Sequence, residues 1–133
     1  MNGRRLQVSV ETALDHSSLC TGFPYDVQLN PAAPLGLFDR LVRQARDMRR
    51  MGSAALELTW VAAGRFDGLF EFGLKPWDVT AGALLIEEAR GFIACLDGTP
   101  WDSRFGDVVA AGPASSRNSA VSAPCSSTAR VGP

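Results

Sequence analysis

Glu71 and Asp78 are the residues of this sequence whose types and positions best suit binding chemistry. Asp78 falls in the first turn of a predicted helix that begins at Pro76, and Glu71 ends the predicted strand before it. The first turn of a helix offers unpaired N–H groups and a partial positive charge, so an acid placed there stays ionised and exposed. Such a position suits a hard cation or a phosphate group, but one carboxylate alone does not make that site.

The strand and the helix that position these acids are both visible in the sequence pattern. The aromatic residues of segment 66–72 share one side of the strand, and Asp67 and Glu71 share the other, which predicts an aromatic face and an acidic edge. The helix runs to about Ala89, with proline at its preferred first position. Its broad apolar character predicts burial on more than one side.

Strands and helices alternate along the rest of the chain, which is typical of an α/β layer fold with a mixed sheet and covering helices. The other predicted elements are strands at 6–10, 18–21, 92–96 and 107–111, a helix with apolar positions from Leu37 to Met48, and a helix that Ser53 caps and Gly64 ends. Asp97 and Gly98 predict a hairpin turn.

Composition fits one ordinary globular domain and excludes several classes of function. The 133 residues are 46% hydrophobic and 20% charged, and the formal net charge is −1. We therefore expect no binding to nucleic acid or to an anionic membrane. The start lacks the apolar core of a signal peptide, and three widely spaced cysteines predict reduced thiols, so we expect a cytoplasmic protein.

The last twenty residues differ from the rest of the chain. Residues 114–133 are rich in serine, alanine and proline, lack any period and contain almost no large apolar residue. We expect a disordered tail there, after a single domain of residues 1–113. Its abrupt start suggests a shifted reading frame or a decayed end.

Several short motifs occur together and in a specific order. The most specific are Gly52-Ser-Ala-Ala55, then Glu71, then Pro76-Trp-Asp-Val-Thr-Ala-Gly82 and finally Gly106-Asp-Val-Val-Ala-Ala111. In this order they resemble the C-terminal half of the inositol monophosphatase family of magnesium-dependent, lithium-sensitive phosphatases. The resemblance covers about residues 2–113 and implies the C-terminal lobe of a layered αβαβα sandwich.

The resemblance also implies roles for particular residues. Asp78 would be a ligand of the second Mg²⁺ ion, and Glu71 would bind hydroxyl groups of an inositol or sugar ring. Gly52, Ser53 and Ala54 would line the substrate pocket. The implied reaction is hydrolysis of a phosphate monoester by metal-activated water, and the implied oligomer is a homodimer.

The sequence departs from the family in ways that bear on activity. The family carries its first metal ligands and water-activating residues on an N-terminal lobe, in a Glu-Glu pair and an Asp-Pro-x-Asp-Gly-Thr loop, and this sequence contains neither. We therefore expect the isolated chain to be inactive. The alternative is a non-catalytic dimerisation or interaction module, or a decayed remnant of such an enzyme. Arg90 stands where the family has glycine, which predicts a strained position.

Simpler structural roles account for the same residues without the resemblance. Asp78 is then a favourable helix acid, Glu71 a solvated acid at a strand edge, and Ser53 a helix cap first. Trp60, Trp77 and Trp101 are predicted core or interface anchors, and Trp77 is expected to wedge the strand-to-helix turn.

Overall fold

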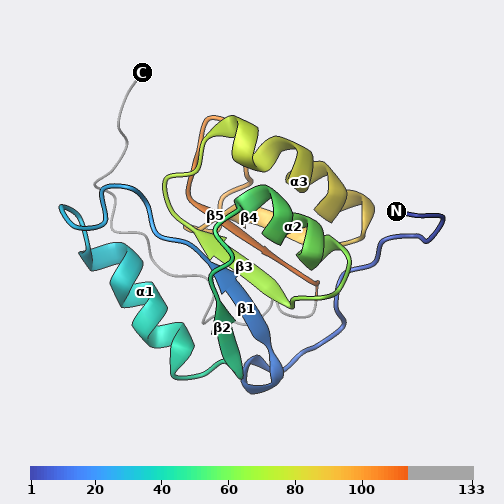
Figure 1. The fold of residues 1–133 in the computed structure, drawn as a ribbon, viewed down its shortest axis with the longest axis horizontal. Helices are drawn as coiled ribbons and strands as arrows, with labels where there is room; N and C mark the ends of the chain where they lie inside the picture. The colour runs from blue at the N-terminus through green and yellow to red at the C-terminus, as the bar shows by residue number, and fades with distance from the viewer. Residues whose placement is uncertain (114–133) are drawn as a thin grey trace.

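A five-stranded mixed sheet with helices on both faces forms the fold in the computed structural model, which describes residues 1–113 (Figure 1). The strands are β1 (Ser18–Thr21), β2 (Asp47–Arg49), β3 (Gly68–Glu71), β4 (Phe92–Cys95) and β5 (Val108–Ala111). Their order in the sheet is β2-β1-β3-β5-β4, with β1 parallel to β2 and β3, and β5 antiparallel to β3 and β4. The predicted α/β fold is confirmed.

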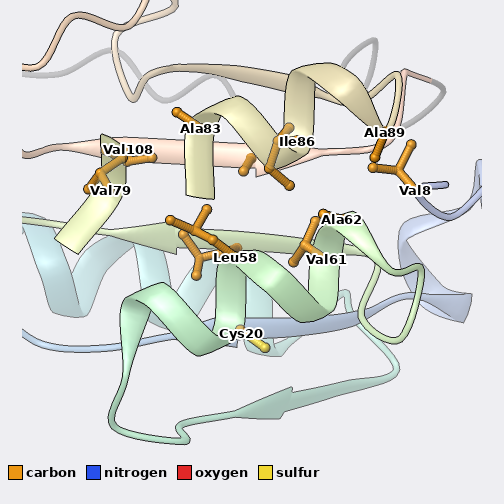
Figure 2. Close-up of a cluster of buried hydrophobic side chains, with 12 residues drawn as sticks. Val8, Cys20, Leu58, Val61, Ala62, Val79, Ala83, Ile86, Ala89 and Val108 are labelled. Atoms are coloured by element: carbon orange, nitrogen blue, oxygen red, sulfur yellow. The ribbon is translucent and has the colours of Figure 1, made fainter. Parts of the chain in front are cut away.

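Helices α2 (Ala54–Ala62) and α3 (Pro76–Glu88) cover one face of the sheet (Figure 1). Alternate strand residues point to this face, among them Cys20 of β1, Leu69 of β3 and Val108 of β5. The two helices pack closely, since a side chain at Gly82 would lie 2.6 Å from Leu58. Figure 2 shows the resulting core, in which α2, α3 and the sheet all contribute side chains.

Helix α1 (Ala32–Val42) covers the opposite face. Its Leu37 and Leu41 pack against the other set of strand side chains, which includes Leu19, Phe70 and Val109. Helix α1 ends at Val42, so the prediction that its pattern extends to Met48 is wrong. Met48 belongs to β2, a strand of three residues too short to show any alternation.

The predicted N-terminal strand at residues 6–10 is also absent. Val8 is buried, and its N–H donates to the carbonyl oxygen of Ala89 (3.2 Å) just after α3. The alternation of apolar residues there reflects one buried side chain on an extended segment, not a place in the sheet.

Burial of α3 follows one face only, contrary to the prediction. Val79, Gly82, Ala83 and Ile86 are buried, whereas Leu84 is 58% exposed. Trp77 is 79% exposed, so it does not wedge the turn before the helix. Trp60 and Trp101 are half-buried and lie beside the α2–α3 core.

Several local signals are confirmed. Ser53 caps α2 by accepting the N–H of Leu56 (3.4 Å), Gly64 has a positive φ of 72° just after the helix, and α3 begins at Pro76. Gly98 has a φ of 84° and its N–H donates to Cys95, which makes the predicted turn.

The thiols of Cys20 and Cys95 are buried and free, and burial raises the pKa of Cys20. The tail predicted at 114–133 lies outside the described residues. Among the described helices, none has the length and apolar content needed to cross a membrane.

The end of α3 confirms the predicted strain at Arg90. The N–H of Gly91 donates to Ile86 (2.7 Å) and that of Arg90 to Glu87 (3.0 Å), which is a Schellman ending. This ending requires a left-handed residue, and Arg90 has a φ of 64°. For a residue with a Cβ atom this conformation costs roughly 1 kcal/mol.

We expect Arg90→Gly to raise the free energy of unfolding by about 1 kcal/mol, because glycine adopts a positive φ without that cost. Urea denaturation of the full chain measures the change. Arg90→Ala is the control, since it removes the same long side chain but keeps the Cβ atom. Equal stability of the Arg90→Gly and Arg90→Ala proteins would contradict the strain.

Candidate functional site

The carboxyl ends of two parallel strands, β1 and β3, meet at one edge of the sheet. The register pairs Thr21 with Phe70, so Gly22 and Glu71 follow as neighbours just beyond it. A Cβ atom at Gly22 would lie 2.7 Å from Glu71 Oε2, which means that the Glu71 carboxyl occupies the space a side chain there would need. A side chain at position 22 would therefore require the Glu71 carboxyl to move.

Glu71 is buried, with 7% of its surface exposed, and is not the solvated acid predicted for a strand edge. All four residues of β3 are buried, because β1 and β5 flank the strand and helices lie over it. Burial, together with the Glu57 carboxyl and the charge of Asp78, raises the pKa of Glu71 to about 8, while Arg50 opposes the rise. Glu71 is therefore a neutral carboxylic acid over much of the ordinary pH range.

Glu57 is the residue of this edge that the sequence analysis missed. It lies in the first turn of α2 and is 0% exposed. Its Oε1 accepts the N–H of Met51 (2.7 Å), whereas Oε2 is buried and has no hydrogen-bond partner among the described residues. A signal was present in the sequence, because an acid at position 57 interrupts the apolar stripe formed by Ala54, Leu58 and Val61.

The loop before α2 carries the three residues predicted to line a pocket. Gly52 has a φ of 84°, Ser53 caps the helix, and Ala54 is its first residue. Glu57 relates this loop to Glu71, since one of its oxygens accepts the N–H of Met51 and its carboxyl contributes to the raised pKa of Glu71. The structure thus brings the loop and Glu71 to the same edge.

Asp78 lies in the first turn of α3 and is half-buried. Its Oδ2 accepts the N–H of Lys75 (2.9 Å), and its own N–H donates to the Lys75 carbonyl oxygen (2.9 Å). The side chain therefore caps the N-terminus of α3, as expected of an acid in a first helical turn. It is neither buried among apolar groups nor distant from Glu71, whose pKa it raises.

The described residues do not fit a complete magnesium site. Within residues 1–113, no three His, Cys, Asp or Glu side chains lie close enough together to hold a metal ion. One oxygen of Asp78 already serves the helix start, and Glu71 and Glu57 face each other. The described chain can offer an ion a single carboxylate at this edge.

A small apolar cavity lies elsewhere, at the opposite ends of β1 and β3. It has a volume of about 20 Å³ and is lined mainly by apolar groups, including Leu14, Leu41 and Ala111. That volume holds about one water molecule. None of Glu57, Glu71 and Asp78 lines this cavity.

The edge therefore combines groups suited to two kinds of ligand atom. The N-termini of α2 and α3 present N–H groups and partial positive charge, which favour an anion such as phosphate. The buried carboxyl of Glu71 can both donate a hydrogen bond and accept one, as a hydroxyl group can.

Comparisons with known proteins agree with the resemblance in the sequence. The model of the inositol monophosphatase family matches residues 1–127. Nus factor SuhB of Pseudomonas aeruginosa is 46% identical over 112 residues, which are 83% of this chain and 41% of that protein. Nus factor SuhB of Escherichia coli is 42% identical over 113 residues, or 85% of this chain and 42% of the relative.

Solved structures show the same relationship. An inositol monophosphatase from Anabaena superposes with a TM-score of 0.81 and 41% sequence identity, over 86% of this chain and 46% of that one. The chain thus spans less than half the length of the relatives it matches.

The raised pKa of Glu71 predicts how stability depends on pH. The ordinary pKa of 4.5 applies in the unfolded chain and about 8 in the folded one, so folding favours the protonated form. This contribution is complete below about pH 4.5 and is lost as the pH rises toward 8. We expect the free energy of unfolding to fall across that window by an amount on the order of a few kcal/mol.

Urea denaturation at several pH values tests this expectation. Glu71→Gln keeps the shape of the side chain without its titration, and should remove most of the decline. Glu87→Gln, at an exposed position of α3, is the matched control and should keep it. A decline that persists unchanged in the Glu71→Gln protein would contradict the assignment.

Proposed function

This chain belongs to the inositol monophosphatase family, and we propose that residues 1–113 form the substrate-binding side of a phosphatase that hydrolyses inositol or sugar phosphates with Mg²⁺. Glu71 would bind ring hydroxyls, and Gly52, Ser53 and Ala54 would line the pocket. Asp78 would supply one ligand to a magnesium ion whose other ligands come from outside the described residues.

One observation carries the proposal. Glu71 lies at the carboxyl end of β3, and acids in the first turns of α2 (Glu57) and α3 (Asp78) both raise its pKa. In open α/β sheets, ligands bind beyond the carboxyl ends of parallel strands, where helix N-termini also converge. A phosphorylated ring placed there would meet N–H groups for its phosphate and a carboxyl for its hydroxyls.

The same geometry predicts that the chain alone is inactive. One carboxylate cannot hold the metal ions that activate water and neutralise phosphate charge. Mg²⁺ at this edge would add positive charge beside Asp78, but the described residues do not complete its coordination. The dimeric state, the absence of nucleic-acid binding, and the alternative of a non-catalytic interaction module stay predictions.

We expect the 133-residue chain to bind myo-inositol 1-phosphate in the millimolar range, since the described residues supply one side of the site. Backbone NMR shifts should change at residues 51–54 and 71–78 and leave α1 unchanged, because α1 lies on the other face. Colorimetric phosphate release with excess Mg²⁺ should not exceed that of Asp78→Asn.

Two outcomes would contradict the proposal. Saturation without any shift at the two segments would exclude a substrate site at this edge. Turnover above the Asp78→Asn control would show that the chain completes a catalytic site by itself.

A further inference from the structure

We propose that the segment after Gly3 is one strand of a β-hairpin, and that its open edge binds a second, antiparallel strand of polypeptide that leads into Met1. The segment lies outside the five-stranded sheet, beyond the end of α3 (Figure 1). The inference concerns an interaction surface of the domain and does not depend on the proposed function.

The first four residues form a tight turn of the kind that joins two strands. Asn2 has a φ of 51° and Gly3 a φ of 74°. A type I′ hairpin turn requires a positive φ at both central residues, and Asn-Gly is its preferred sequence. Arg4 N–H donates to the Met1 carbonyl oxygen (3.0 Å), and the Met1 amino group donates to the Arg4 carbonyl oxygen (2.6 Å). Met1 and Arg4 are therefore bonded as the closing pair of a hairpin.

The strand that leaves this turn has an open edge. In an antiparallel hairpin, every second residue faces the partner strand with both its N–H and its C=O, and Leu6 is the next such residue after Arg4. Neither backbone group of Leu6 makes a hydrogen bond within residues 1–113. The side chain of Leu6 is half-buried and packs against the α2–α3 core. Its free backbone groups therefore lie at the side of the strand, where a partner would meet them.

The residues that follow are closely packed against the domain. Space for them comes from three glycines that each follow a helix or a strand, namely Gly64, Gly91 and Gly112. A Cβ atom at the first would lie 2.9 Å from the Gln7 carbonyl oxygen, and one at the second would lie 2.7 Å from the Val8 side chain. This packing holds residues 7–9 and so preorganises the strand before them for binding.

The bonding pattern also defines the length and the side chains of the partner strand. Val8 already donates its N–H to the Ala89 carbonyl oxygen (3.2 Å), so pairing ends before it. The residue two positions before Met1 would exchange both hydrogen bonds with Leu6. Its side chain would share the face of the Leu6 side chain, so we expect it to be apolar. The residue directly before Met1 would face Arg5, which is exposed, so we expect a polar or acidic side chain.

A strand continuous with Met1 fits this edge best, because Met1 already fills the first position of that strand in the correct register. The relatives contain further polypeptide that can supply such a strand, since this chain spans less than half of their length. A strand from a second copy of this chain would lack the covalent link to Met1. Protein concentration distinguishes the two occupants.

Extension of the 133-residue chain before Met1 by Gly-Thr-Val-Glu tests the proposal, with valine opposite Leu6 and glutamate opposite Arg5. Amide hydrogen exchange of Leu6, measured by ¹⁵N NMR, should be roughly tenfold slower than in the chain extended by Gly-Thr-Pro-Glu, because proline has no N–H to donate to Leu6. The Val8 N–H, which binds Ala89, should be equally protected in both proteins. Equal exchange of Leu6 in the two proteins would overturn the proposal.

Gly3→Ala in the chain extended with valine tests the turn itself. A Cβ atom at position 3 would meet no atom within 4 Å, so the substitution adds strain at a φ of 74° without a clash. The protection of Leu6 should fall about fivefold. Gly36→Ala in α1 is the matched control, since position 36 is equally open and has no positive φ, and it should keep the protection. Equal protection of Leu6 in the two variants would overturn the proposal.

The 133-residue chain without any extension tests the identity of the occupant. We expect its Leu6 amide to exchange rapidly and at a rate that does not depend on protein concentration. If a second copy occupied the edge, Leu6 would be protected without an extension, and more strongly at higher concentration. That result would overturn the assignment of the edge to a strand continuous with Met1.

Discussion

Two buried carboxyl groups that cannot both be charged determine the arrangement at one edge of this sheet. Glu57 and Glu71 lie on different elements, α2 and β3, and both side chains are buried. Burial of two carboxylates close together is unfavourable, which is why burial and Glu57 raise the pKa of Glu71. Through the bond from Met51, that pair also fixes where the loop before α2 lies.

The topology of the sheet explains why these groups meet. Strands β1 and β3 run parallel, so Gly22 and Glu71 leave the sheet together, and α2 and α3 pack on the same face. The segment after β3 is held on its other side, where Gly73 N–H donates to Asp107 just before β5 (2.9 Å). Glu71 is thus enclosed by both of its neighbouring strands and by α2.

Local signals in the sequence predicted the elements well, and the buried pair poorly. Ser53, Gly64, Pro76 and Arg90 act on the backbone at the ends of their own helices, so their roles could be recognised without the fold. The place of Glu57 in the apolar stripe of α2 indicates burial, but its effect on Glu71 could not be recognised, because Glu71 lies on a strand more than ten residues away. The same limit explains Trp77, which a local pattern placed inside and the packing of α3 leaves exposed, and β2, which depends on pairing with β1.

Membership of the inositol monophosphatase family explains the motifs that contain Glu71 and Asp78, but Glu57, which also raises the pKa of Glu71, lies outside them. The central claim is that one carboxyl of the Glu57–Glu71 pair remains protonated. Infrared spectroscopy of the full chain at about pH 6, where isolated carboxyls are ionised, measures this most directly. The account predicts a carboxylic acid C=O band that disappears in Glu71→Gln, whereas a spectrum with carboxylate bands alone would contradict it.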